Sequence, residues 1–322
     1  MSASGSSGIK LGLDVGGTTT RAVALDEYGR LLGRGTAPGG NPASHGTATA
    51  LARLADAVRQ ALGGADPGLV SRCLIGLSGY RALGDRTARD AFATDAGRAF
   101  GLHPGTPVLL TSDAVIAFAA GTSSPSGTVL IAGTGSIACR VERGVVTRTS
   151  GGLGWLLGDE GGGHWLGREA VRRALAALRG GASTGPLVAA VLARSGCHDH
   201  DSLIRWAYQG SPQHLAALAP LLAPAAEQGD PAALGAIELA VRHLRDITRD
   251  ANQGHLDGPV VLAGSVATSP GPLRDLLTQS LTRAGAAAVL LAHDPALAAA
   301  DSMIGHESRP SQRGGGPAQL GL

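Results

Sequence analysis

Residues 9–25 read IKLGLDVGGTTTRAVAL and decide the fold class. Residues 9–15 alternate in character and run into Gly16-Gly17, and residues 20–25 form a second extended segment, which together predict two strands joined by a tight turn. A turn signal at 26–29 and a third extended run at 30–36 follow. The first glycine pair therefore belongs to a hairpin, and the chain contains neither a P-loop nor a dinucleotide-binding fingerprint.

The same pattern returns about 120 residues further along the chain. Residues 129–132 predict a strand, Gly133-Thr134-Gly135-Ser136 predict a second glycine turn, and the runs 137–141 and 145–149 predict two more strands. This repetition indicates two similar halves. The other expected strands are 72–77, 107–111, 260–263 and 289–291, and the expected helices are 47–62, 85–100, 164–179, 186–195, 214–228, 231–252, 270–284 and 295–304. Because strands and helices intermingle, the predicted class is α/β.

Composition and charge narrow the kinds of protein to consider. The 322 residues allow two domains, and 43% hydrophobic residues suit a globular chain. A net charge of +2 without a basic cluster argues against nucleic acid, and no apolar run is long enough to span a membrane. The three cysteines form no CxxC pair, so we expect free thiols in a reducing cytoplasm. Residues 1–8 and the tail 306–322 are expected to be disordered.

Two turns rich in glycine and hydroxyl side chains are candidates for binding phosphate. In the turn Gly16, Gly17, Thr18 and Thr19, glycines let backbone N–H groups approach an anion and threonines add donors, although an ordinary hairpin turn is the alternative. The turn from Gly133 to Ser136 is its equivalent, so the two could clamp the β- and γ-phosphates from both sides. Asp14, at the end of the first strand, is a candidate Mg²⁺ ligand through water.

Asp113 lies where an expected strand meets a helix that starts near Ala114. The structural interpretation is that Ser112 or Asp113 only caps this helix. The functional interpretation makes Asp113 a general base that takes a proton from a sugar hydroxyl. A helix N-terminus favours the charged carboxylate, which is expected to lower its basicity while keeping it ready to accept a proton.

The stretch from Gly151 to Trp165, GGLGWLLGDEGGGHW, is the most unusual in the chain. Carboxylates such as Asp159 accept hydrogen bonds from sugar hydroxyls, and an aromatic face such as that of Trp155 packs on the apolar side of a pyranose. A flexible linker is the alternative, but linkers rarely carry tryptophan and leucine in this density. We interpret His164 as structural.

A third glycine turn follows the expected strand at 260–263. Gly264, Ser265 and Ala267 lie at a strand-to-helix junction where the backbone can approach an adenine or a ribose. A plain strand-to-helix turn is equally consistent with these residues.

Taken together, these segments resemble the sugar-kinase and actin superfamily, and within it the BadF-type ATPases, most closely the N-acetylglucosamine kinases. The resemblance spans about residues 9 to 305, and the Leu-Gly-Asp-Glu-Gly run at 157–161 is its most specific part. It implies an actin-like (ribonuclease H-like) fold of two domains, each with a mixed five-stranded sheet, and a central cleft. The implied domains are residues 9–120 together with the last helix at 294–305, and residues 121–293.

Carried over by position, the resemblance assigns roles to individual residues. Asp113 matches the catalytic base, and Asn41 matches an asparagine that binds sugar hydroxyls. The sugar-facing segments match Thr134, Gly135, Gly152 and Asp159. Leu153 and Gly162 depart from the pattern, since many relatives have Trp and Ser there, so glucosamine stays open beside N-acetylglucosamine as the acceptor.

Two other classes share the expected fold. An activator ATPase of radical dehydratases needs cysteines to hold an iron–sulfur cluster, and the scattered cysteines here argue against it. A sugar-sensing repressor of the ROK group needs an N-terminal helix-turn-helix, for which the first strand at residue 9 leaves no room, and the ROK cysteine-rich zinc motif is missing.

The expected reaction follows the general scheme of phosphoryl transfer. Mg-ATP would bind between the halves, with the sugar oriented by Asn41, Asp113 and Asp159, and closure would exclude water. Asp113 would accept the proton as the sugar oxygen attacks the γ-phosphorus. Transfer to the 6-hydroxyl is implied by the resemblance alone. We further expect a homodimer.

Overall fold

The computed structural model describes residues 8–180 and 185–302, so the predicted disordered ends lie outside the described residues except for Gly8. The strands are β1 (Ile9–Val15), β2 (Thr19–Leu25), β3 (Leu31–Pro38), β4 (Val70–Leu77), β5 (Val108–Ser112), β6 (Ser126–Ala132), β7 (Ser136–Glu142), β8 (Val145–Gly151), β9 (Pro259–Ala263) and β10 (Ala288–Leu291). The helices are α1 (Pro42–His45), α2 (Thr47–Leu62), α3 (Arg86–Ala99), α4 (Asp113–Ala119), α5 (Gly163–Arg179), α6 (Pro186–Ser195), α7 (His200–Tyr208), α8 (Pro212–Ala216), α9 (Leu222–Glu227), α10 (Pro231–Ala251), α11 (Ser265–Thr268), α12 (Pro272–Arg283) and α13 (Pro295–Asp301). Short 3-10 helices lie at Pro67–Leu69, Tyr80–Leu83 and Ala219–Leu221.

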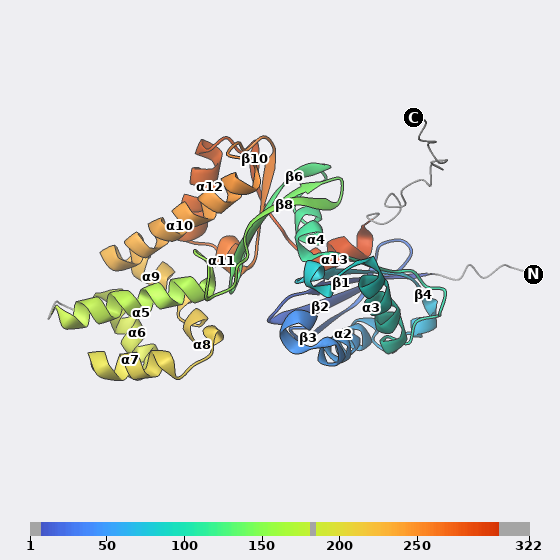
Figure 1. Ribbon diagram of the computed structural model, residues 1–322, viewed down its shortest axis with the longest axis horizontal. Coiled ribbons are helices and arrows are strands. Elements are labelled where there is room, and N and C mark those ends of the chain that lie inside the picture. The colour runs from blue at the N-terminus through green and yellow to red at the C-terminus, as the bar shows by residue number, and fades with distance from the viewer. Residues whose placement is uncertain (1–7, 181–184, 303–322) are drawn as a thin grey trace, which may run out of the picture.

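Two five-stranded sheets form the centres of two lobes (Figure 1). The order is β3-β2-β1-β4-β5 in the first sheet and β8-β7-β6-β9-β10 in the second, so the strands are arranged identically in chain order. In each sheet the first three strands pair antiparallel, the fourth pairs in parallel with the first, and the fifth pairs in parallel with the fourth. The predicted α/β class and the internal repeat are therefore confirmed.

The parallel strands of the first lobe end together at one edge of their sheet. Val15 pairs with Leu77, and Leu77 pairs with Ser112, so the residues that follow β1, β4 and β5 emerge side by side. Ligand sites in parallel sheets form at this carboxyl edge, because the turns after the strands meet there.

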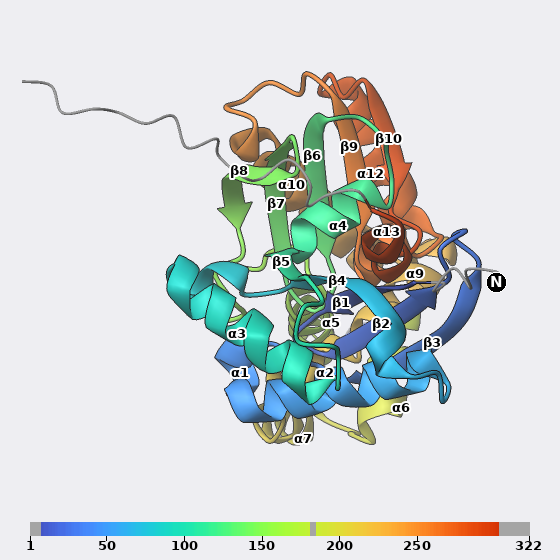
Figure 2. The ribbon, with the colours of Figure 1, turned by 90° about the vertical axis from the view of Figure 1, so that its right-hand side faces the viewer.

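Two helices cross between the lobes. Each follows the last strand of one sheet and packs on the other sheet: α4 buries Phe118 among residues of the second sheet, and α13 buries Ala296 and Ala300 against β2 (Figure 2). The contact with β1 requires Gly12, because a Cβ there would lie 2.1 Å from the Ala300 nitrogen. The chain thus passes from the first lobe to the second through α4. The domain boundary near residue 120 stays a prediction.

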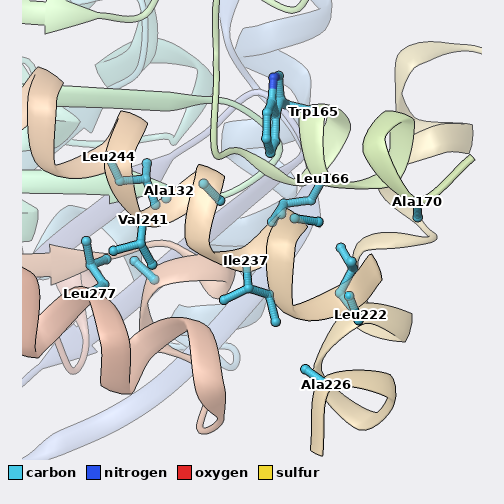
Figure 3. Packing of buried hydrophobic residues seen from close by; sticks show 14 of the residues in the cluster. Ala132, Trp165, Leu166, Ala170, Leu222, Ala226, Ile237, Val241, Leu244 and Leu277 are labelled. Carbon is cyan, nitrogen blue, oxygen red and sulfur yellow. The ribbon is translucent and has the colours of Figure 1, made fainter. Parts of the chain in front are cut away.

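The helices of the second lobe build the larger core (Figure 3). On α10 the apolar residues recur every three or four positions, and Ile237 and Leu244 are almost fully buried. Trp165 and Leu166, at the start of α5, lie in the same cluster. Burial of these two side chains fixes the N-terminus of α5 beside the β6–β7 turn.

The expected helix at 214–228 is wrong. The segment contains α8, a 3-10 turn and α9, because Pro220 lacks an N–H and its ring clashes within a helix interior. Helix α7 was not expected, although Asp199 and Ser202 form a capping box at its start. Among residues 8–180 and 185–302, no helix has the length and apolar character needed to cross a membrane.

Candidate active site

The two glycine turns meet, although they belong to different sheets. The hydroxyl oxygens of Thr18 in the β1–β2 turn and Thr134 in the β6–β7 turn lie 3.4 Å apart. The turns are 116 residues apart in sequence, so only the packing of the lobes brings them together. A triphosphate at this point would contact both turns.

The first turn, Gly16 to Thr18, is held by the segment that follows β3. The Gly39 N–H donates to the Thr18 carbonyl at 2.9 Å, and a Cβ on Gly39 would lie 2.0 Å from the Gly17 oxygen. A Cβ on Gly17 would meet nothing within 4 Å, so Gly17 itself faces open space. Thr19 begins β2, and its carbonyl accepts the Gly16 N–H at 2.9 Å.

The second turn is held by the backbone at the start of α5. The N–H groups of Gly163 and His164 donate to the carbonyls of Gly133 and Thr134 at 2.7 and 3.0 Å. The Ser136 hydroxyl is buried and donates to the Glu160 carbonyl at 2.8 Å, so it stabilises the turn instead of facing a ligand.

Asp159 lies against this second turn in a strained conformation. Its φ is +61°, and a Cβ on Gly135 would lie 2.2 Å from its Oδ2. Partial burial raises the pKa of Asp159, against the lowering effect of the backbone N–H groups of Ser136 and Gly154. The carboxylate is thus fixed beside Gly135 as an oriented hydrogen-bond acceptor.

Asp113 follows β5 and is the first residue of α4. Its Oδ1 accepts the Ala114 N–H at 2.9 Å and the Ser112 hydroxyl at 3.2 Å, while Ser112 is the N-cap. Burial raises the pKa of Asp113, although hydrogen bonds from Ser112, Ala114 and Ser78 act to lower it. The expectation that the helix N-terminus lowers its basicity is therefore wrong, because desolvation outweighs the helix dipole.

Asp14 lies at the end of β1 and pairs with Arg21 at 3.3 Å. Burial and the charge of Asp113 raise the pKa of Asp14 to about 6, despite Arg21. A buried carboxylate whose ionised form is destabilised by a second carboxylate suits a divalent cation, which would offset both charges. The described residues contain no group of three or more His, Cys, Asp or Glu that could hold a metal.

Asn41 caps α1, and its Oδ1 accepts the Ala43 N–H at 2.9 Å. Its side chain lies against Gly79, where a Cβ would be 2.8 Å from Oδ1. Gly79 has a φ of +77° and follows Ser78, whose hydroxyl donates to Asp113. The Ser78-Gly79 corner therefore touches both predicted sugar-site residues, Asn41 and Asp113. The sequence signal for this corner is its place directly after β4, the parallel strand beside β5.

The loop after β8 carries exposed apolar side chains next to Asp159. Trp155 is half exposed, and its ring contacts the buried His164 edge-on, with ring centroids 5.5 Å apart. Burial and Arg168 lower the pKa of His164, in keeping with a structural role. Gly152 has a φ of +68°, and a Cβ there would lie 2.7 Å from Ile137, so the loop leaves β8 through a position that favours glycine.

The third segment packs behind the second turn. Gly264 has a φ of +81°, and a Cβ there would lie 2.4 Å from the Ala132 carbonyl and 2.9 Å from the Gly133 nitrogen. Ser265 is exposed at the start of α11. The side chain of Ala267 is fully buried in the core, so it offers a nucleotide no surface and can only help to place the turn.

Comparison with known proteins agrees with this arrangement. The chain is 29% identical over 291 residues to N-acetyl-D-glucosamine kinase of Dictyostelium discoideum, with 85% of this chain and 90% of the relative covered. It is 29% identical over 261 residues to a glucosamine kinase of Vibrio cholerae, covering 80% of this chain and 84% of the relative. A solved structure from Chromobacterium violaceum, assigned provisionally as an N-acetylglucosamine kinase, matches with a TM-score of 0.68 and 29% identity over 91% of this chain and 98% of that one. The model of the BadF/BadG/BcrA/BcrD ATPase family matches residues 11–300, and the chain belongs to this family.

Proposed function

We propose that the chain is an ATP-dependent amino-sugar kinase that transfers the γ-phosphoryl group to the 6-hydroxyl of N-acetylglucosamine. The contact between Thr18 and Thr134 carries this proposal, because it unites two glycine turns at one point. Such paired turns suit the β- and γ-phosphates of one nucleotide. The family membership and the named kinases among its relatives support the same reaction.

The protein groups would act by positioning and proton transfer. Asn41 and Asp159 would orient the sugar, and Asp113 would take the proton from its hydroxyl as that oxygen attacks the γ-phosphorus and ADP leaves. The raised pKa of Asp113 makes it a better proton acceptor. Asp14 would hold Mg²⁺ through water, and the ion would offset charge on the phosphates.

Glucosamine is the second candidate acceptor. The relatives include a glucosamine kinase at the same identity as the N-acetylglucosamine kinase. The structure explains the glycine at position 162, because a Cβ on Gly162 would lie 2.7 Å from the Gly135 backbone. Nothing in the structure explains Leu153, which is 64% exposed. These two departures therefore do not decide between the acceptors.

An iron–sulfur activator ATPase is disfavoured by the cysteines. Cys73 lies in β4, Cys139 lies in β7 and Cys197 follows α6, and all three are free and buried. Burial raises the pKa of Cys73 and Cys139, which disfavours the thiolate needed to bind a cluster. Within this proposal the protein acts in the cytoplasm and forms a homodimer. Light scattering of the purified protein would test whether it is a dimer.

A coupled ADP-release assay across several sugars tests the function. The panel is N-acetylglucosamine, glucosamine, N-acetylmannosamine, glucose and muramic acid derivatives, each with Mg-ATP. We expect the highest kcat/KM with N-acetylglucosamine and a 6-phosphate product by NMR. A higher value with glucosamine would select the second candidate, and no sugar-dependent ADP release with any of them would refute the kinase assignment.

A further inference from the structure

The segment from Gly39 to His45 touches both proposed substrate sites. Its first residue packs on the Gly17 carbonyl, and the Arg53 guanidinium of α2 donates to the Gly39 carbonyl at 2.6 Å, which fixes the segment from behind. Its middle carries Asn41. Its last helical residue, His45, lies with Nε2 3.1 Å from the Gly17 carbonyl oxygen.

The bond from His45 has a defined direction. A carbonyl oxygen only accepts, so the imidazole must carry its proton on Nε2 and donate it to Gly17. The two residues are 28 positions apart, so this bond is a tertiary contact and not a feature of the turn. A Cβ on Gly17 would meet nothing within 4 Å, so Gly17 itself adds no side-chain packing, and the peptide that follows it is held by the backbone at Gly39 and by His45.

Orientation of that peptide determines what the turn offers a phosphate. In a trans peptide the C=O and N–H groups point in opposite directions. A Gly17 carbonyl held toward His45 therefore holds the Thr18 N–H toward the other side. In the same turn the Thr18 hydroxyl already faces Thr134.

Helix α1 connects this contact to the sugar site. Asn41 caps its first turn through Ala43, and His45 is its last residue, so the two side chains are attached to the two ends of one four-residue helix. A sugar that immobilises Asn41 would also immobilise His45. Reciprocally, a nucleotide that orders the first turn would favour the position of α1 that binds sugar.

We propose that His45 is a positioning residue that orients the first phosphate turn, and that α1 couples sugar binding at Asn41 to nucleotide binding at Gly17 and Thr18. This role rests on the proposed kinase function. It predicts that N-acetylglucosamine tightens the binding of the non-hydrolysable nucleotide AMPPNP with Mg²⁺, and that part of this effect depends on the imidazole N–H.

Three variants of the full chain distinguish the effect of the N–H donor of His45 from the effect of its ring. His45→Phe keeps a ring without the donor, His45→Gln keeps an N–H donor of similar reach, and His45→Ala removes both. Isothermal titration with Mg-AMPPNP, with and without N-acetylglucosamine, measures the affinity and its enhancement by sugar. His103→Phe is the matched control, because His103 is an exposed histidine of the same lobe whose Nδ1 accepts the N–H of its own turn at Gly105.

We expect His45→Phe and His45→Ala to weaken nucleotide binding about fivefold and to lose most of the enhancement by sugar, which corresponds to one hydrogen bond. His45→Gln should stay within about twofold of the wild type, as should His103→Phe. Unchanged binding in His45→Phe, or a Gln variant as weak as the Phe variant, would refute the role of His45 while leaving the kinase function intact. Wild-type protein that binds no Mg-AMPPNP would instead refute the proposed function itself.

Discussion

The β6–β7 turn is held by main-chain groups and the buried Ser136 hydroxyl, whereas the β1–β2 turn depends partly on an exposed side chain. In the second lobe the Gly163 and His164 N–H groups bind the turn carbonyls, and α5 behind them is anchored in the larger core. In the first lobe Gly39 provides one backbone bond, and His45 at the end of a four-residue helix provides a side-chain contact. Equivalent strand orders therefore support two turns that are held in different ways, one by a helix anchored in the larger core and one partly by an exposed histidine.

The same comparison extends to the acids after the last strand of each sheet. Asp113 follows β5 and keeps a raised pKa, whereas Asp294 follows β10, caps α13 by accepting the Leu297 N–H at 3.0 Å and pairs with Arg34. Two similar positions thus have different surroundings. The difference lies in their partners, because Arg34 pairs with Asp294, whereas Asp113 forms no ion pair within residues 8–180 and 185–302.

The largest expected effect separates these two acids. Asp113→Asn should lower kcat by about 10²–10⁴-fold, because it removes the proton acceptor, while Mg-AMPPNP affinity changes little. Asp294→Asn should keep kcat within about threefold and lower stability by less than about 1 kcal/mol, because asparagine still caps α13 and only the ion pair with Arg34 is lost. Steady-state kinetics, isothermal titration and thermal unfolding measure the three quantities. A near-normal kcat in the Asp113 variant would remove it from the catalytic role.

Asp14 should make the fold less stable as the pH rises. Its pKa of about 6 in the folded state exceeds the ordinary value of 3.8, so between about pH 4 and 6 the folded state binds more protons than the unfolded state. The free energy of unfolding should therefore fall through this window, and Asp14→Asn should stabilise the ligand-free protein by up to about 3 kcal/mol at pH 7 but not below pH 4.

Urea unfolding at several pH values tests the effect of Asp14. Asp56→Asn, in an exposed ion pair on α2, is the matched control and should show little dependence of this kind. A stability difference between wild type and Asp14→Asn that is the same at pH 4 and pH 7 would contradict the prediction.

Glycine substitutions behind each turn should reveal how closely the turns are held. Gly39→Ala and Gly162→Ala should each destabilise the protein by about 1–3 kcal/mol, because the new Cβ would approach the backbone of Gly17 or Gly135 within 2.0 and 2.7 Å. Gly17→Ala should cost less than about 0.5 kcal/mol, because its Cβ meets nothing within 4 Å. Equal losses in all three, measured by denaturant unfolding without ligand, would mean that the packing behind the turns is not the cause.

Ser78 should have the smallest effect. Ser78→Ala removes a hydrogen bond to Asp113 and should lower kcat by about three- to tenfold with little change in the KM for ATP, because only the orientation of the base is lost. Ser71→Ala, at the other end of β4, is the matched control, since the Ser71 hydroxyl donates to the Ile9 carbonyl far from the site. A kcat loss of the same size in both variants would point to a general effect on the strand.

Much of the fold and part of the site could be predicted because they depend on local patterns. The strand boundaries around Gly16 and Gly133 follow from alternation and glycine, and the helix from 47 to 62 appears within one residue of expectation. The segment 214–228 differs from the single expected helix, because Pro220 within it favours a break. Ser78 and His45 carry no local pattern of their own, since a serine after a strand and a histidine before a glycine are common.

By itself the sequence determined two repeated hairpins, the glycine turns at their tips and the carboxylates at the strand ends, since these features arise from interactions between near neighbours in the chain. Only the tertiary structure decided that Thr18 meets Thr134 and that His45 reaches Gly17. It also decided that α4 and α13 each pack on the sheet of the other lobe. It also decided the raised pKa of Asp113, which the helix position alone predicted in the opposite direction. The physical reason is that desolvation and contact depend on which distant segments are buried together, and no short stretch of sequence contains that information.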